Sequence, residues 1–231
     1  MNILITGASS GIGYSLAKKF ASETSNNVIV LARNGEKLNK LAASVSGNII
    51  AVEFDLIKYD YTLLLATLAK EGIDHIDILI HNAGLLVYKP FGELEVADWE
   101  HIYKTNVIGV ALLTKALLGK IGGVEHTHIV TIGSIGGVNG TSKFTGLSAY
   151  SSSKGALSTL TECLAEEFRG QNVTANCLAL GAVHTEMLQK AFPGYVAKLT
   201  AEEISDYIYD FSVGGWRYFN GKILQVSVTN P

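Results

Sequence analysis

The sequence predicts an α/β protein with a doubly wound, Rossmann-type parallel sheet of about seven strands, in a single domain over residues 1–231. Three observations lead to this fold class. Short apolar runs alternate with stretches of helical periodicity along the whole chain. Most of these runs are apolar at every position, as in strands that helices cover on both faces. The chemically distinctive residues follow the ends of these runs, and parallel strands share one carboxyl edge, where ligands bind.

The expected elements alternate between strand and helix as far as the sixth strand. The first strand, Ile3–Thr6, leads through a glycine turn into a helix over Tyr14–Ala21. The later strands are short apolar runs: Val28–Ala32, Ile49–Phe54, Ile76–Ile80, His128–Ile132, Val173–Leu178 and Lys222–Val228. Helical patterns lie around Leu38–Ala42, over Tyr59–Ala69, over Trp99–Leu118 and from Tyr150 to Arg169. The stretch His184–Lys198 shows no clear pattern, and we expect a substrate lid around residues 184–200.

Tyr150 and Lys154 form the most informative pair in the sequence. They are four residues apart at the start of an expected helix, so their side chains lie on one face. The positive end of the helix dipole and the Lys154 ammonium should both lower the pKa of the tyrosine hydroxyl, which is ordinarily about 10. Such a tyrosine can exchange protons near neutral pH. An ordinary exposed pair on an amphipathic helix would have the same spacing.

The glycine turn, residues 7–13, lies between the first strand and the first helix. Backbone N–H groups and a helix N-terminus in this arrangement bind phosphate. The turn also fits the G-x-S-x-G nucleophile elbow, which leaves open a serine hydrolase with Ser9, Asp55 or Asp77, and His184. That elbow normally follows several strands, whereas this turn follows the first.

Further motifs follow the later strands. Asn82-Ala83-Gly84 comes after the fourth strand, Ser134 comes after the fifth, and Asn106 lies within the longest expected helix. Together with the T-G-x-x-x-G-x-G turn and Tyr150-x-x-x-Lys154, and in the same order, these motifs resemble those of the short-chain dehydrogenase/reductase family. The resemblance covers essentially the whole chain. It implies a nicotinamide-dependent oxidoreductase that interconverts a carbonyl compound and an alcohol.

The resemblance implies four catalytic residues. Tyr150 would exchange a proton with the substrate oxygen, and Ser134 would hydrogen-bond the same oxygen. Lys154 would bind the nicotinamide ribose and lower the pKa of Tyr150. Asn106 would anchor a water that relays protons to Lys154. Taken alone, Ser134 could be a turn serine, and Asn106 could be a polar residue on an exposed helix face.

The resemblance also implies the cofactor contacts. Asp55 would accept a hydrogen bond from the adenine amine and Leu56 would pack on the ring, although Asp55 could instead cap the next helix. Thr185 matches the residue that hydrogen-bonds the carboxamide, and could otherwise be a loop threonine. The expected cofactor-binding residues are Gly7, Ser9, Ser10, Gly11, Ile12, Gly13, Arg33, Asp55, Leu56, Asn82, Ala83, Gly84, Tyr150, Lys154, Gly181, Val183 and Thr185.

Two departures from the family pattern affect these expectations. Ser134 precedes Tyr150 by sixteen residues, so the loop between them is longer than is common in the family, which should alter the substrate mouth. Ser142 and Ser148 are alternatives to Ser134, but Ser134 directly follows a strand. In addition, Leu180 stands where the family usually has proline, so the backbone before Gly181 lacks the restraint of a proline ring.

The residues at the end of the second strand indicate whether NAD(H) or NADP(H) is preferred. It ends in Ala32-Arg33-Asn34, without the carboxylate that accepts hydrogen bonds from the ribose 2′-hydroxyl of NAD. Arg33 can instead donate two N–H groups to a 2′-phosphate, and Ser10 can add a hydroxyl. We therefore expect NADP(H) to be preferred and the enzyme to act as a carbonyl reductase. An NAD-dependent alcohol dehydrogenase and a dinucleotide-binding sensor without catalysis are the alternatives.

Composition limits the partners. A net charge of −3 gives no general attraction to nucleic acid, and no apolar run approaches membrane-spanning length. Cys163 and Cys177 form no motif and are expected to be buried thiols of a reduced, cytoplasmic protein. His126 and His128 lack a third ligand, so we expect no metal. The resemblance implies a homodimer or homotetramer that pairs the helices Trp99–Leu118 and Tyr150–Arg169.

The expected substrate is a small carbonyl or alcohol compound. The loop Leu85–Leu94 and the segment His184–Lys198 should line its pocket. Their apolar and aromatic residues favour an apolar or aromatic carbonyl compound, and a 3-oxoacyl thioester is the commonest substrate in the family. The residues that carry this expectation are Tyr88, Phe91, Met187, Leu188, Phe192 and Tyr195.

Overall fold

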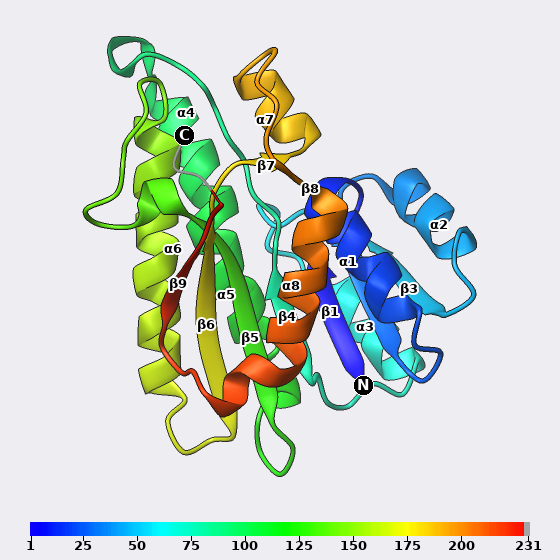
Figure 1. Cartoon of the computed structure of the whole chain (residues 1–231). Helices are drawn as coiled ribbons and strands as arrows, with labels where there is room; N and C mark the ends of the chain where they lie inside the picture. The colour runs from blue at the N-terminus through cyan, green and yellow to red at the C-terminus, as the bar shows by residue number, and fades with distance from the viewer. Residues whose placement is uncertain (229–231) are drawn as a thin grey trace.

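Seven parallel strands form the central sheet, in the order β3-β2-β1-β4-β5-β6-β9 (Figure 1). The computed structural model describes residues 1–228, so the last three residues of the expected domain lie outside the described part. The strand order reverses between β1 and β4, which confirms the doubly wound fold. The strands are β1 (Asn2–Thr6), β2 (Asn27–Ala32), β3 (Asn48–Glu53), β4 (Ile78–His81), β5 (Thr127–Ser134), β6 (Val173–Leu180) and β9 (Ile223–Val226).

Helices cover both faces of the sheet. One face carries α1 (Gly11–Ala21), α2 (Gly35–Ala43) and α8 (Ala201–Gly214). The other carries α3 (Thr62–Lys70), α5 (Gly109–Ala116) and α6 (Ser148–Glu167), with α4 (Val96–Tyr103) leading into α5. Beyond the carboxyl ends of the strands lie α7 (Glu186–Ala191) and the paired short strands β7 (Val183–His184) and β8 (Leu199–Thr200) (Figure 1).

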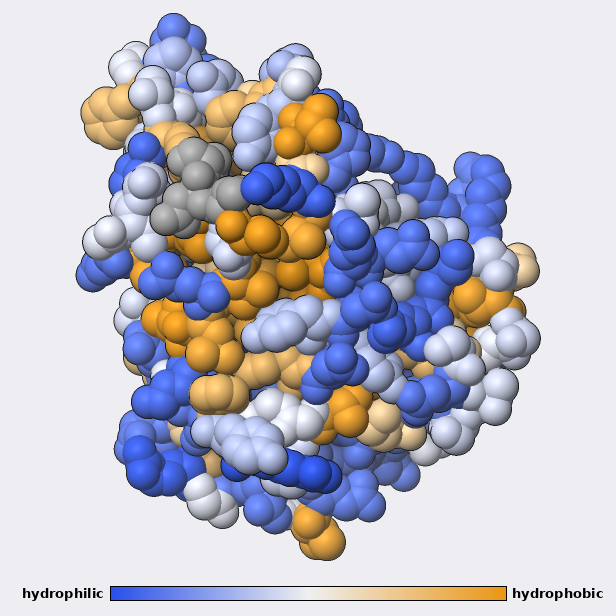
Figure 2. Space-filling model, viewed as in Figure 1, coloured by the Kyte–Doolittle hydropathy of each residue, from blue (hydrophilic) through white to orange (hydrophobic). Residues whose placement is uncertain are grey.

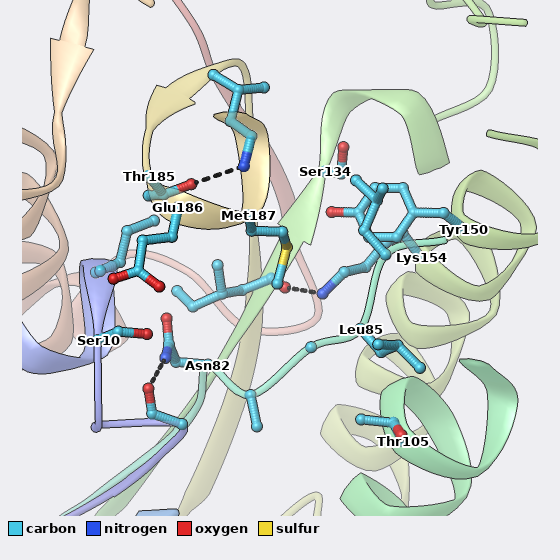
Figure 3. A pocket seen from close by; sticks show the side chains of 18 of the residues that line it. Ser10, Asn82, Leu85, Thr105, Ser134, Tyr150, Lys154, Thr185, Glu186 and Met187 are labelled. Carbon is cyan, nitrogen blue, oxygen red and sulfur yellow. Dashed lines mark hydrogen bonds between the residues drawn. The ribbon is translucent and has the colours of Figure 1, made fainter. Parts of the chain in front are cut away.

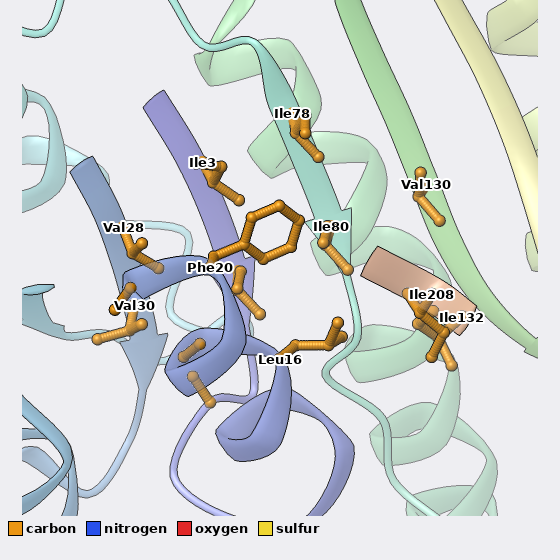
Figure 4. Packing of buried hydrophobic residues seen from close by; sticks show 14 of the residues in the cluster. Ile3, Leu16, Phe20, Val28, Val30, Ile78, Ile80, Val130, Ile132 and Ile208 are labelled. Carbon is orange, nitrogen blue, oxygen red and sulfur yellow. The ribbon is translucent and has the colours of Figure 1, made fainter. Parts of the chain in front are cut away.

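The core consists of two apolar layers, one on each face of the sheet. Ile3 and Ile5 point into the layer with α1, whereas Leu4 points into the layer with α3 and α5, because successive side chains on a strand alternate. In the first layer, Leu16 and Phe20 of α1 pack across β1 and β4 (Figure 4). Burial on both faces explains why these strands are apolar at nearly every position.

The helix expected over Trp99–Leu118 is built from three pieces. It begins earlier, at Val96, where Glu95 and Asp98 form a capping box, and α5 ends at Ala116. Between α4 and α5, Lys104–Ile108 form a π-helical turn that contains Asn106. Such turns often mark functional positions. None of the helices in residues 1–228 is both long and apolar enough to span a bilayer.

Two other helices differ from expectation. α3 begins at Thr62, after Asp60 accepts a hydrogen bond from the Thr62 N–H, and not at Tyr59, whose φ of 55° is left-handed. Helix α8 has no counterpart among the helices predicted from the sequence. Its start is nevertheless encoded locally, because Thr200 and Glu203 form a reciprocal capping box.

Candidate active site

A cavity of about 1130 Å³ opens at the carboxyl ends of the strands, and almost every site residue expected from the sequence lines it. Only Gly13 and Asn106 lie outside its lining. The sequence-predicted residues in the lining are Gly7, Ser9, Ser10, Gly11, Ile12, Arg33, Asp55, Leu56, Asn82, Ala83, Gly84, Ser134, Tyr150, Lys154, Gly181, Val183 and Thr185.

The glycine turn is packed directly against the end of β4. A Cβ on Gly7 would lie 2.8 Å from the Ala83 Cα, and a Cβ on Gly13 would lie 2.6 Å from the Gly7 carbonyl oxygen. Asn82 Nδ2 donates to the carbonyl oxygens of Thr6 and Gly7 at 2.9 and 3.2 Å. Thr6 Oγ1 in turn accepts from the backbone N–H groups of Asn82 and Ala83. The absence of a side chain at Gly13 and the hydrogen bonds of Asn82 therefore fix the shape of the turn.

Ser134 and Tyr150 meet at the cavity wall. Ser134 is the last residue of β5. Tyr150 is the third residue of α6 and so lies in the first turn of this helix, as the sequence predicts. Both residues line the cavity, and the two side chains lie together in Figure 3. Ser134 Oγ also accepts from the Gly136 N–H at 3.3 Å. Neither alternative serine, Ser142 or Ser148, lines the cavity.

Lys154 lies one helical turn beyond Tyr150 and is buried, with 4 % of its surface exposed. Its ammonium donates to the Ile132 carbonyl oxygen at 2.7 Å and lies 5.9 Å from the centroid of the Tyr150 ring (Figure 3). A Cβ on Gly84 would approach Lys154 Nζ to 3.4 Å. Gly84 and Lys154 are therefore neighbours in the cavity lining.

Burial dominates the titration of this pair. It raises the pKa of Tyr150 to about 12, and the neighbouring Ser134 hydroxyl opposes this only in part. Burial also lowers the pKa of Lys154 to about 8. The direction for Tyr150 is opposite to the one expected from the sequence. Removing water from the hydroxyl disfavours the phenolate more than its neighbours stabilise it.

Asn106 is fully buried behind the cavity, so the alternative of an exposed polar residue is wrong. Its Oδ1 accepts from the Leu85 N–H at 2.7 Å, and its Nδ2 donates to the Leu85 carbonyl oxygen and to Ser153 Oγ, both at 2.9 Å. The side chain thus ties the loop after β4 to α6, beside Lys154. Its anchoring of a water stays a prediction.

The longer loop between Ser134 and Tyr150 is held by its own polar groups. Lys143 Nζ donates to the carbonyl oxygens of Val138 and Thr141, at 2.6 and 3.1 Å, and to Thr141 Oγ1 at 2.9 Å. Thr141 Oγ1 donates back to the Val138 carbonyl oxygen at 2.8 Å. Hydrogen bonds within the loop therefore hold its conformation. The end of the loop places Phe144 and Leu147 in the cavity lining.

The far end of the cavity contains the expected adenosine-side residues. Asp55 accepts from the Ile57 N–H at 3.2 Å, which places it in a local turn. The next helix begins only at Thr62, so the alternative that Asp55 caps it is wrong. Arg33 is exposed on the lining, and its guanidinium has no hydrogen-bond or ion-pair partner among residues 1–228.

The segment after β6 is restrained without a proline. Leu180 extends β6 and pairs with Val226, and the Gly181 N–H donates to the Val226 carbonyl oxygen at 2.9 Å. Pairing with β9 therefore fixes this backbone. Thr185 is the N-cap of α7 and accepts from the Leu188 N–H at 3.3 Å, so it has a structural partner as well as a place on the cavity wall.

The substrate side differs in part from expectation. Met187, Leu188, Phe192 and Tyr195 line the cavity, but Tyr88 and Phe91 do not. The sequence reading missed several lining residues. His101 and Thr105, four apart on one helical face, carried a spacing signal, whereas Phe144 and Leu147 reach the cavity only through the fold of the longer loop. The missed residues also include Glu186, whose carboxylate points toward Ser10 in Figure 3.

Neither cysteine is among the residues that line this cavity, and neither are His126 and His128. Cys177 is buried as expected, but Cys163 is exposed, because it lies on the outer face of α6. His126 Nε2 contacts Thr174 Oγ1, and both nitrogens of His128 have partners, Ser212 and Asn176. In residues 1–228, three potential metal ligands converge only at the opposite edge of the sheet: His75, Asp77 and Glu125.

Fold and site together define an oxidoreductase of the Rossmann type, in which a glycine turn, a strand-end serine and a Tyr-x-x-x-Lys helix meet in one cavity. The sequence profile of the short chain dehydrogenase family matches residues 1–195. The chain belongs to the short-chain dehydrogenase/reductase family.

Individual relatives agree with this assignment. A 3-oxoacyl-[acyl-carrier-protein] reductase of Aquifex aeolicus is 32% identical over 188 residues, 80% of this chain and 74% of the relative. The crystal structure of a 3-ketoacyl-(acyl-carrier-protein) reductase from Brucella melitensis, complexed with NADH, superimposes with a TM-score of 0.87 at 25% identity, covering 98% and 96% of the two chains. A short chain dehydrogenase from Burkholderia cenocepacia in complex with NADP has the same fold, with a TM-score of 0.82 at 23% identity over 97% and 95%.

Proposed function

We propose that the protein is an NADPH-dependent reductase that converts a ketone or aldehyde carbonyl to an alcohol. The observation that carries this proposal is that Ser134 and Tyr150 lie together at the cavity wall, with the Lys154 ammonium 5.9 Å from the centroid of the Tyr150 ring. When bound, the nicotinamide would supply the hydride. Ser134 holds the carbonyl oxygen and Tyr150 donates the proton that completes the alcohol. Lys154 binds the ribose hydroxyls, and its positive charge favours proton release from Tyr150.

A turnover assay tests this function. The purified protein is mixed with NADPH or NADH and a panel of aliphatic and aromatic ketones, aldehydes and acetoacetyl-CoA, which represents 3-oxoacyl thioesters. We expect carbonyl-dependent oxidation of the dinucleotide, with the apolar compounds favoured because Met187, Leu188 and Phe192 line the cavity. Dinucleotide binding without turnover of any carbonyl would support the sensor. Ester hydrolysis without dinucleotide binding would support the serine hydrolase. Of the two acids considered for that hydrolase, Asp77 lies at the opposite edge of the sheet from the cavity, where it accepts a hydrogen bond from the Asn2 N–H.

Arg33 supports NADPH as the preferred cofactor. Among residues 1–228 the Arg33 side chain has no competing partner, and it lines the cavity. Ala32, where a carboxylate would repel the 2′-phosphate, lines the cavity too. A charge-assisted hydrogen bond contributes about 1.5–3 kcal/mol, which is roughly ten- to hundredfold in affinity. One observation favours the NAD alternative: Glu53 pairs with Ala32 across the sheet, and its carboxylate lies against Gly35. Glu53 does not line the cavity, however.

The ratio of kcat/KM for NADPH to that for NADH should exceed one in the wild type and fall by roughly ten- to hundredfold in Ala32→Asp/Arg33→Ala. Lys37→Ala is the matched control, because Lys37 is an exposed cation in the first turn of α2 that lies outside the cavity. Glu53→Gln tests the alternative, since it would lower NADH activity only if that carboxylate holds the ribose. A wild type that prefers NADH would contradict the assignment.

We also propose that the protein assembles as a homodimer or homotetramer. Val110, Leu113 and Leu117 are buried in the monomer, whereas Ile108 is 42 % exposed on the same helical segment. Figure 2 shows a further apolar strip over β9 and β6, and within residues 1–228 β9 pairs with a strand on one side only. Light scattering at micromolar concentration should give at least twice the mass of one chain, and the mass of a single chain would refute this assembly.

We further propose a cytoplasmic location, since both cysteines are free thiols.

A further inference from the structure

Tyr88 lies outside the cavity but contacts the wall of its substrate side. The Tyr88 ring is 5.3 Å from the Phe192 ring, centroid to centroid, at an interplanar angle of 67°. Phe192 lines the cavity and Tyr88 does not, so Phe192 lies between the cavity and Tyr88. In residues 1–228, this is the one aromatic pair that joins residues 184–200 to the rest of the protein. We call residues 184–200 the lid segment.

Tyr88 itself is anchored to the body of the protein on two sides. The N–H of the next residue, Lys89, donates to the Gly146 carbonyl oxygen at 3.0 Å, and Lys89 Nζ pairs with Asp98 of α4 at 2.8 Å. The Tyr88 ring lies so close over Gly146 that a Cβ there would be 2.7 Å from it. Gly146 follows the loop that Lys143 braces. Tyr88 is therefore a fixed point against which the lid segment packs.

The lid segment has little else to hold α7 in place. Met187 and Glu186 are exposed, and the Gln189 side chain bonds within the segment, to the Tyr195 carbonyl oxygen at 2.6 Å. Apart from Ala191, no residue of α7 is buried. A short helix with few buried contacts opens readily, so one edge-on aromatic contact is a sizeable share of what keeps it closed.

We propose that Tyr88 is a specificity-determining residue that acts through Phe192: it holds the lid segment closed and so limits the size of the carbonyl compound that the cavity accepts. This rests on the proposed function. The longer loop after Ser134 has a direct part, because it supplies Gly146, on which the Tyr88 ring rests. Substrates that fit beneath Phe192 are retained, whereas larger ones must displace the Phe192 ring from Tyr88.

Hydrogen–deuterium exchange tests the contact without reference to activity. Tyr88→Ala and Phe192→Ala should each raise exchange of the α7 amides about three- to tenfold, because an aromatic pair shifts the opening equilibrium by roughly that factor. The double variant should add little to either single change, and Tyr88→Phe should behave like the wild type. Phe91→Ala is the matched control, since Phe91 is on the same loop but packs edge-on against Trp99. Equal exchange in Tyr88→Ala and Phe91→Ala would overturn the proposal.

Kinetics test the size limit. Acetophenone and the larger 4-acetylbiphenyl are compared in wild type, Tyr88→Ala and Phe91→Ala. In Tyr88→Ala we expect KM for acetophenone to rise at little-changed kcat, and the kcat/KM ratio to shift at least threefold toward 4-acetylbiphenyl. An unchanged ratio would refute the size limit. A wild type that turns over no carbonyl would refute the proposed function and the size limit with it, whereas the exchange data would still decide whether Tyr88 holds the lid segment.

Discussion

Tyr150→Phe is expected to lower kcat by roughly 10²- to 10⁴-fold, the contribution typical of a positioned general acid. The substitution removes one hydroxyl and leaves the ring in place, so folding and dinucleotide binding should persist. The lost hydroxyl belongs to the tyrosine that lies beside Ser134 at the cavity wall. Because burial raises the pKa of Tyr150 to about 12, the residue carries its proton throughout the neutral range and is available as a donor to a carbonyl oxygen.

Steady-state turnover and fluorescence titration of the dinucleotide, measured on the same preparation, check this result. Tyr218→Phe is the control, because it makes the same chemical change at a residue that is 80 % exposed and outside the cavity. Turnover of Tyr150→Phe within a factor of a few of the control would remove Tyr150 from the proposed role. Loss of dinucleotide binding would instead indicate that the hydroxyl serves mainly in cofactor contact.

Lys154→Met should weaken cofactor binding and turnover together. Methionine keeps most of the length of the side chain but cannot donate hydrogen bonds to ribose hydroxyls, a loss of about 1.5–3 kcal/mol or roughly ten- to hundredfold in affinity. The positive charge beside Tyr150 is lost as well, so kcat should fall in addition to the rise in cofactor KM. Lys120→Met is the matched control, since Lys120 Nζ also donates to a backbone carbonyl, that of Ile73, at 2.7 Å, but outside the cavity.

The same pair of variants reports the pKa of the buried ammonium. Below about pH 8, Lys154 is protonated in both the folded and the unfolded chain, and the folded state carries the full cost of burying the charge. Between about pH 8 and 10 the unfolded chain binds more protons, so the free energy of unfolding should rise with pH. Above pH 10 the raised pKa of Tyr150 acts in the opposite direction. Denaturant unfolding should show the rise in Lys120→Met and not in Lys154→Met, and a rise in both would place its origin elsewhere.

Much of the fold and of the candidate site was determined by short-range patterns. The spacing of Tyr150 and Lys154 fixes their common helical face, since residues four apart on a helix are neighbours wherever the helix packs. The positions of Gly7, Asn82 and Ser134 directly after apolar runs place them at one edge, because parallel strands in a doubly wound sheet end on the same side. These inferences need only the local chain direction and the class of sheet.

Other features depended on contacts between residues that are distant in the sequence. Asn106 is fully buried, and its amide is satisfied by Leu85, 21 residues away: the Leu85 N–H donates to Oδ1, and Nδ2 donates to the Leu85 carbonyl oxygen. The pKa of Tyr150 moves upward because the fold removes water from its hydroxyl, which neither the helix dipole nor the nearby lysine reveals in advance. Tyr88 lies outside the cavity, where its ring packs over Gly146 and against the Phe192 ring. Desolvation and side-chain packing are properties of the assembled tertiary structure, and local spacing alone does not encode them.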